Sequence, residues 1–181
     1  ARMYGVDFSL AATGKLSRDW TLSLLGGYNY SLPQTLNPNL TYATDSLGND
    51  LKYQNTSSIT ETDDSSATIL KYRFRHTAKM DVELTWKILS LGCSYRYNSF
   101  MENIDRAFYR LDELALNTNL ASFRDRTRDG THVVDMRVAV QITPSSRLSL
   151  IINNLFNNAY SLRPLFPEPP RSFIMQYALT L

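Results

Sequence analysis

The chain has 181 residues, a net charge of +2, 43% hydrophobic residues and a single cysteine, Cys93. The near balance of charge, without a basic cluster, argues against nucleic-acid binding, and one cysteine excludes an internal disulfide. No apolar run approaches the length of a membrane-spanning helix, and the mean hydropathy is −0.28. The composition leaves a soluble protein or a membrane protein that crosses the bilayer with β-strands.

Alternation of apolar and polar residues with period two predicts an all-β protein with seven long antiparallel strands. In chain order these are residues 3–13, 20–32, 68–86, 89–102, 132–143, 147–156 and 171–181. The clearest alternation lies between Leu70 and Trp86, with His76 as its exception. Most of the segments exceed the five or six residues usual in soluble sheets, and their length suits transmembrane strands.

The two faces of these predicted strands differ in charge. An Arg or Lys at the midplane of a lipid-facing surface costs about 2–4 kcal/mol, and the apolar face carries neither, so we expect it to contact lipid. The other face is expected to line a wet or plugged barrel lumen, where its charges pair among themselves or contact a plug. The residues of this face are Lys71, Arg73, Arg75, Lys79, Asp81, Glu83, Arg96, Asp135 and Arg137.

The connections between the predicted strands alternate in length. Short turns alternate with long loops at residues 33–67, 103–131 and 157–170. Outer-membrane barrels keep short turns on the periplasmic side, which predicts extracellular loops and a periplasmic C-terminus. An odd number of strands would leave unpaired edges in lipid. We therefore expect the chain to be the C-terminal part of a larger barrel, completed by the same precursor, by a separate chain or by copies of itself.

Ligand contacts are expected in the loops, where binding residues concentrate. Loop 103–131 combines aromatic and guanidinium groups that suit an anionic or aromatic ligand, although its arginines can instead pair with acidic residues of the same loop. The candidate residues are Phe108, Tyr109, Arg110, Phe123, Arg124, Arg126 and Arg128. Residues Leu111 to Ala121 are predicted to form a short helix. In the first loop, Asp45 to Asp50 fits a calcium turn less well than an ordinary turn, because it lacks the spacing of an EF-hand.

The C-terminal segment carries recognisable motifs. Ile151 to Tyr160 reads IINNLFNNAY, and a proline-rich loop leads to Pro170–Phe173, which reads PRSF, and to a last alternating strand. This order resembles the end of TonB-dependent outer-membrane receptors. The stretch Leu70 to Ala78 is similar to the strand that follows a large outer loop in that family, with Phe74 where a proline is common.

The resemblance implies a 22-stranded barrel closed by a plug, of which these would be the last seven strands. Such receptors bind a scarce ligand, such as a siderophore, heme, cobalamin, glycan or peptide, and import it with energy from TonB. The implied partners are the remaining strands and the plug, TonB acting through the plug, the barrel-assembly machinery, outer-membrane lipid and a surface lipoprotein. The implied insertion signal is Phe173, Tyr177, Leu179 and Leu181, with Leu181 where such barrels usually end in Phe or Trp.

Nothing in the sequence predicts an enzyme, a metal site or a cofactor. His76 and His132 lie on different predicted strands without a carboxylate or cysteine at ligand spacing, and no catalytic motif occurs. Two alternatives to a transporter stay open. One is a passive porin or another outer-membrane barrel. The other is a soluble β-sheet binding protein, which would have to explain the aromatic and aliphatic residues that line one face of such long strands.

Overall fold

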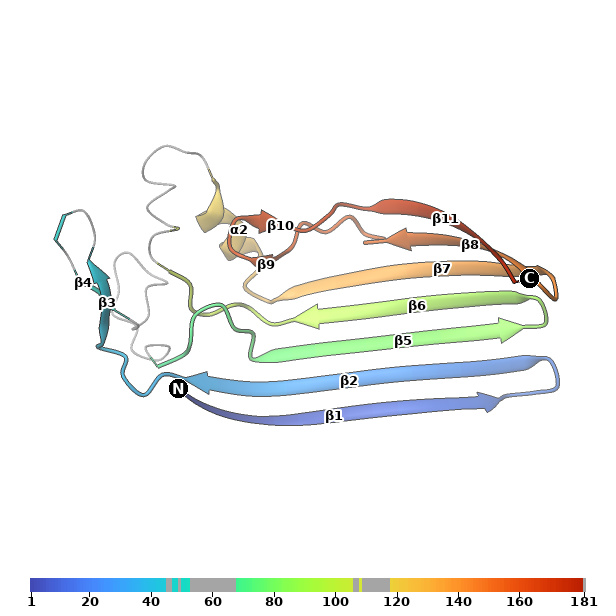
Figure 1. Cartoon of the computed structure of the whole chain (residues 1–181), viewed down its shortest axis with the longest axis horizontal. Coiled ribbons are helices and arrows are strands. Elements are labelled where there is room, and N and C mark those ends of the chain that lie inside the picture. The colour runs from blue at the N-terminus through green and yellow to red at the C-terminus, as the bar shows by residue number, and fades with distance from the viewer. Residues whose placement is uncertain (45–46, 49, 53–67, 106–107, 109–117, 181) are drawn as a thin grey trace.

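The computed structural model describes residues 1–44, 47–48, 50–52, 68–105, 108 and 118–180. Seven long strands form one sheet in the order β1-β2-β5-β6-β7-β8-β11, and each is antiparallel to its neighbours (Figure 1). The all-β class and the seven-stranded antiparallel sheet are therefore confirmed. The strands are β1 (Arg2–Lys15), β2 (Trp20–Gln34), β5 (His76–Trp86), β6 (Leu89–Asn98), β7 (Thr131–Thr143), β8 (Ser146–Asn153) and β11 (Ser172–Leu179).

Short elements that the sequence did not predict lie in the long connections. β3 (Thr41–Thr44) pairs with β4 (Asp50–Lys52), and β9 (Ser161–Arg163) pairs with β10 (Phe166–Pro167). They lie with helix α2 (Leu120–Arg126) at one end of the sheet, and the tight hairpin turns lie at the other end (Figure 1). Among the described residues, no helix has the length and apolar character needed to cross a membrane.

The predicted helix at Leu111–Ala121 is only partly testable. Residues 109–117 lie outside the described residues, and in the described part α2 begins at Leu120, near the C-terminal end of the predicted range. Thr118 and Asn119 are not helical, and Asn119 has a φ of +52°, so the prediction is wrong at these two residues and α2 overlaps the predicted range only at Leu120 and Ala121.

The strand predicted at residues 68–86 is wrong in its first part, because β5 begins only at His76. Tyr72 has a φ of +63°, which an extended strand does not contain. Its N–H donates to the carbonyl oxygen of Asn103 at 2.8 Å instead of to a sheet neighbour. Residues 70–75 thus belong to the loops, not to the sheet. The residues removed from the predicted inward face are Lys71, Arg73 and Arg75.

The strand predicted at residues 89–102 also ends early, at Asn98. Met101 is only 8% exposed and packs with the loops instead of continuing the alternation. The final strand, predicted at 171–181, runs from Ser172 to Leu179. Both strands therefore end slightly earlier than the hydrophobic pattern indicated.

Asn154 ends β8 at Asn153, three residues before the predicted end at 156. Asn154 has a φ of +51° and is 2% exposed. Its side-chain Oδ1 accepts the N–H of Asn158 at 2.9 Å, and its Nδ2 donates to the carbonyl oxygen of the same residue at 2.9 Å. Asn tolerates a left-handed conformation better than most residues do. The Asn-Leu-Phe-Asn sequence therefore forms a turn that is closed by its first asparagine.

Replacing this asparagine tests its role in the fold. Asn154→Ala should lower the free energy of unfolding by about 2 kcal/mol, because it removes the two hydrogen bonds from the buried Asn154 side chain to the backbone of Asn158 and puts a Cβ without a polar group at positive φ. Asn158→Ala, at an exposed residue, serves as the control and should cost less than half as much. Urea unfolding of the full-length protein in detergent measures both. Equal losses would contradict the role assigned to Asn154.

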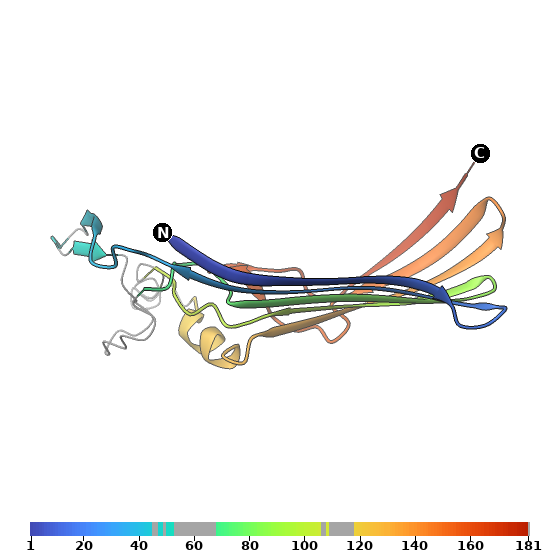
Figure 2. The same ribbon diagram turned by 90° about the horizontal axis from the view of Figure 1, so that it is seen from below.

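The two faces of the sheet differ in how far their side chains are exposed. On the charged face of β7, Val133 is 1% exposed and Ala139 is 2% exposed, whereas Leu150 and Met175 on the apolar face are 44% and 78% exposed. The sheet bends most strongly toward the ends of β8 and β11 near the C-terminus (Figure 2). Because side chains crowd on the concave side of a curved sheet, the charged face is the concave one, and it is called the inward face below.

A band of aromatic residues crosses the apolar face at the end of the sheet where the hairpin turns lie. Trp20 and Trp86 are register partners, and their rings stack with centroids 5.8 Å apart. The same row of register partners continues across the sheet through Leu89 and Leu148 to Tyr177 on β11.

A second band crosses the apolar face at the loop end. The hydroxyl of Tyr28 lies 2.7 Å from Nδ1 of His76, the first residue of β5. The hydroxyl of Tyr95 lies 2.7 Å from Nδ1 of His132 in the same arrangement. His76 broke the predicted alternation because it belongs to this aromatic band.

Candidate functional site

The loop end of the sheet is organised around a small apolar core. Met101, Ile104 and Leu120 are buried there, and Phe74 and Leu165 pack against them. These residues come from three connections that are distant in the sequence. The core therefore fixes the loops relative to one another and to the sheet.

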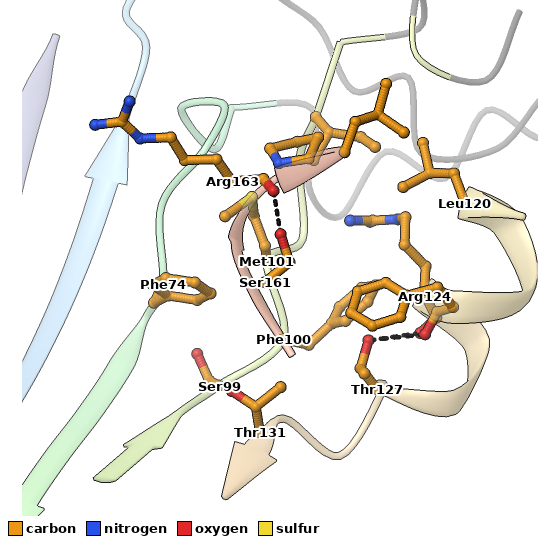
Figure 3. A pocket seen from close by; sticks show the side chains of 14 residues that line it. Phe74, Ser99, Phe100, Met101, Leu120, Arg124, Thr127, Thr131, Ser161 and Arg163 are labelled. Carbon is orange, nitrogen blue, oxygen red and sulfur yellow. Dashed lines mark hydrogen bonds between the residues drawn. The ribbon is translucent and has the colours of Figure 1, made fainter. Parts of the chain in front are cut away.

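Arg124, a sequence candidate for ligand contact, lies inside this loop layer. It is 8% exposed, and its guanidinium carbon lies 4.5 Å from the ring centroid of Phe100. Its Nη2 donates to the carbonyl oxygen of Glu102 at 3.4 Å. Figure 3 shows Arg124 beside a cavity of about 50 Å³, with Thr127 bonded to its carbonyl oxygen. Arg124 thus attaches α2 to the segment that follows β6, and the cavity has room for only a few water molecules.

An open cleft of about 480 Å³ lies beside this core. Two exposed arginines, Arg73 and Arg163, face it, and neither has an ion-pair partner among the described residues. Lys71 adds a third cation, whose Nζ lies 3.3 Å from Oδ2 of Asp105. The remaining lining residues are Tyr72, Phe108, Leu162, Pro164 and Phe166. The cleft therefore combines positive charge with aromatic walls.

Tyr72 occupies the cleft in a backbone conformation that is costly for a non-glycine residue, with a φ of +63°. Its ring meets the ring of Phe108 edge-on at a centroid distance of 6.2 Å. Burial and the nearby Asp105 carboxylate raise the pKa of the Tyr72 phenol. At neutral pH the Tyr72 hydroxyl is therefore uncharged.

The other predicted ligand residues lie in different surroundings. Phe108 lines the cationic cleft, as just described. Phe123 and Arg126 line an adjacent apolar groove of about 430 Å³ between α2 and β9–β10. Arg128 is exposed and lies 3.9 Å from the carboxylate of Asp125. The candidates outside the described residues are Tyr109 and Arg110.

The sequence did not identify any of the three cations of the cleft as ligand contacts. It placed Lys71 and Arg73 on a strand, and it did not single out Arg163 in the proline-rich loop. The sequence pointed to Arg163 only weakly, as a cation beside Pro164 and close to Phe166 in a loop expected to be extracellular. Among the described residues, no three His, Cys, Asp or Glu side chains lie close enough to hold a metal ion. The chemistry that the cleft offers is binding of a negatively charged group.

The inward face of the sheet carries a network of ion pairs. Arg137 on β7 reaches across β6 to β5, where its Nη2 lies 3.1 Å from Asp81 and 3.3 Å from Glu83. Arg96 pairs with Asp135 at 2.8 Å. Ser94 also donates to Asp81. These predicted inward residues therefore pair among themselves within the sheet.

Gly92 makes the reach of Arg137 across β6 feasible. An added Cβ at Gly92 would lie 2.8–2.9 Å from three atoms of the Arg137 guanidinium group. The two residues are register partners on β6 and β7. The guanidinium therefore lies directly over the glycine, in space that any other residue would fill.

The residues of the predicted insertion signal lie on the apolar face at the edge of the sheet. Phe173, Tyr177 and Leu179 are 67%, 59% and 56% exposed, and Leu181 lies outside the described residues. Their role in insertion stays a prediction.

Comparison with known proteins gives a structural match and no sequence match. No family model matches the chain, and no curated protein does. The chain is similar to the closed form of the ferric-catecholate import receptor Fiu from E. coli K12, with a TM-score of 0.60 and 18% sequence identity over 98% of this chain. It spans only 20% of the length of that receptor. The fold of the chain is thus similar to that of a segment of this receptor.

Proposed function

We propose that the chain is part of the barrel of a TonB-dependent outer-membrane transporter, with its loops extracellular and its C-terminal end periplasmic. The observation that carries this is the apolar face bounded at each end by an aromatic band. Such bands mark the two interfaces of a membrane. The rest of the barrel, a plug and outer-membrane lipid would be its partners, and TonB would act through the plug. The barrel-assembly machinery and a surface lipoprotein would act as accessory partners.

The spacing of the bands supports a membrane. β5 runs from His76 in one band to Trp86 in the other, over 11 residues. The strand between these two residues is about 34 Å long at about 3.4 Å per residue. A strand tilt of about 40° from the membrane normal reduces the height that it spans to about 26 Å. The apolar band of outer-membrane barrels is about 25 Å tall. A soluble sheet has no reason to separate its aromatic residues by this height.

The cationic cleft supports import of an anionic ligand with aromatic groups. Arg73 and Arg163 offer guanidinium forks to negative oxygens, and Phe108 and Phe166 offer ring faces. The structural neighbour is described as a receptor for ferric catecholates, which are anionic and aromatic. Among scarce ligands, this chemistry fits a siderophore or heme better than a neutral glycan.

The test uses the native polypeptide that contains this sequence, extracted from outer membranes with detergent. A folded transmembrane barrel should change its electrophoretic mobility on boiling, and a TonB-dependent one should be retained by the immobilised periplasmic domain of TonB. A protein that stays soluble without detergent would overturn the membrane assignment. A barrel that ignores TonB but conducts ions steadily in a planar bilayer would be a passive porin.

The cleft arginines should dominate binding of an anionic aromatic probe. Arg73→Gln or Arg163→Gln should each weaken the binding of ferric tris(2,3-dihydroxybenzoate) about tenfold, because a hydrogen bond to a charged group contributes about 1.5–3 kcal/mol. Arg128→Gln is the matched control, since Arg128 lies outside the cleft and is exposed. The affinity of this variant for the probe should equal that of the parent. Titration of Tyr and Trp fluorescence in the full-length protein measures all three. Equal losses in the three variants would indicate nonspecific attraction by net charge.

A further inference from the structure

A hollow of about 290 Å³ lies at the loop end of the sheet, beside the second aromatic band. It is lined by His132, which belongs to that band, and by Arg126, the last residue of α2. Among the residues that the structure describes, no aspartate or glutamate lines it. The hollow is separate from the cationic cleft, with which it shares no lining residue. It therefore offers basic side chains to a ligand without a carboxylate to repel a negative one.

The guanidinium group of Arg126 is available to such a ligand. Arg126 is exposed, and its Nε donates to the carbonyl oxygen of Ser122 at 3.3 Å. The adjacent acid, Asp125, lies 3.9 Å from Arg128 instead. Arg126 thus has no ion-pair partner in the described part of the chain. Its two Nη groups can hold two oxygens of one anion.

Two tyrosines hold His132 in place as a second donor. The hydroxyl of Tyr95 lies 2.7 Å from Nδ1 of His132, and the ring of Tyr97 lies against the imidazole at a centroid distance of 4.8 Å. A phenol that donates to Nδ1 leaves the proton of the neutral imidazole on Nε2. Nε2 has no partner among the described residues. His132 therefore presents an N–H donor even when it carries no charge.

Tyr160 gives an independent indication of a ligand. It is only 7% exposed, and it lines the hollow. Its hydroxyl has no hydrogen-bond partner among the described residues, whereas buried polar side chains nearly always have one. An oxygen acceptor bound in the hollow would satisfy this hydroxyl.

We propose that Arg126, His132 and Tyr160 bind a phosphate group of a lipid in the outer leaflet of the surrounding membrane. A phosphate ester carries the negative charge that an arginine pairs with, and it has enough oxygens for three donors. The position of the hollow selects a lipid as its source. Aromatic bands lie at the level of the lipid headgroups, and basic pockets at this level recognise phosphorylated headgroups.

The inference rests on the proposed function, because only extracellular loops bring this end of the sheet to the outer leaflet. The phosphorylated lipid of that leaflet is a glycolipid, lipid A. The inference adds a lipid site outside the cleft that would take the imported ligand. The bound lipid would connect α2 to the membrane surface through Arg126.

The experiment counts the lipid molecules that stay bound to the full-length folded protein. The protein in detergent is titrated with diphosphoryl lipid A and observed by native mass spectrometry. We expect a single molecule to bind first, and the same glycolipid without its phosphates to bind at least about tenfold more weakly. Inorganic phosphate at the same concentration should not displace the lipid. Equal binding of the dephosphorylated glycolipid, or displacement by inorganic phosphate, would overturn the lipid site.

Three variants locate the bound phosphate. Arg126→Gln should weaken binding of lipid A about tenfold, and Tyr160→Phe, which keeps the ring and loses the hydroxyl, about fivefold. Arg128→Gln is the control, because Arg128 lies near Arg126 but does not line the hollow, and its affinity for lipid A should equal that of the parent. Equal losses in Arg126→Gln and Arg128→Gln would contradict the assignment.

Two further measurements separate this site from the proposed transporter. Arg126→Gln should leave the binding of ferric tris(2,3-dihydroxybenzoate) unchanged, because Arg126 does not line the cationic cleft. Retention on TonB without binding of lipid A would refute this inference alone. Binding of lipid A without retention on TonB would refute only the transporter.

Discussion

Leu24→Arg is expected to keep most of the protein from reaching its folded form in the outer membrane. Leu24 lies on the apolar face of β2, four residues from Trp20 in one aromatic band and four from Tyr28 in the other. Its register partner Val82 and the next residue in the row, Cys93, face the same side. If this row is the bilayer midplane, an arginine there costs about 2–4 kcal/mol. The folded fraction, read from mobility with and without boiling, should fall accordingly.

The adjacent residue provides the control for this prediction. Ser23 lies on the inward face of the same strand and is the register partner of Glu83, so Ser23→Arg places the same charge within reach of a carboxylate. It should change the folded fraction little. If both variants fold as well as the parent, the apolar face does not contact lipid. If both fail equally, the effect arises from β2 itself and not from which face carries the charge.

The faces of the sheet were predictable from the sequence because the side chains of a strand alternate with a period of two. A residue such as Val82 or Asp81 keeps its face whatever the exact ends of its strand. The strand ends were less predictable, because they depend on single backbone conformations. Tyr72 adopts a positive φ that the alternation through residues 70–75 does not reveal. Asn154 gave a better signal, since asparagine favours that conformation.

The cationic cleft was only partly predictable because it joins three connections. The arginine and aromatic content of loop 103–131 pointed to Phe108, which does line the cleft. The same composition pointed to Arg124, which is buried against Phe100. Composition does not distinguish a guanidinium that faces a cleft from one that anchors a helix. Arg163 was missed because its contribution depends on how the β9–β10 hairpin folds beside Tyr72.

The pairing of the inward charges was also beyond the sequence. Arg137 and Asp81 are separated by 56 residues and by an intervening strand. The alternation does not give the register between the strands. It was therefore equally consistent with charges that pair among themselves in a wet lumen and with charges that contact a plug. The structure shows that Arg137 pairs within the sheet and leaves Lys79 exposed. The glycine that allows this pairing had no sequence signal beyond its place in a strand.

Gly92→Ala and Arg137→Met should destabilise the barrel through the same contact. Arg137→Met leaves Asp81 without its ion-pair partner and Glu83 with only the Arg147 guanidinium at 4.0 Å. Loss of one partner of a buried pair costs about 3–5 kcal/mol, and side-chain exposures of 38% and 29% for the two carboxylates reduce this to about 2 kcal/mol. Gly92→Ala should cost about 1 kcal/mol, because the displaced guanidinium outweighs the roughly 0.5–1 kcal/mol gained by replacing glycine in a strand.

The double variant distinguishes this coupling from two independent effects. With methionine at 137, the alanine at 92 displaces no guanidinium. The double variant should therefore be more stable than Arg137→Met alone by the roughly 0.5–1 kcal/mol that alanine gains over glycine in a strand, with a coupling energy of about 1.5–2 kcal/mol. Arg147→Met is the control on the same face, since its guanidinium lies 4.0 Å from Glu83, and it should cost less than about 1 kcal/mol. Additive losses, or a Gly92→Ala variant more stable than the parent, would mean that Arg137 can hold both carboxylates from another position and that Gly92 is not required for the network.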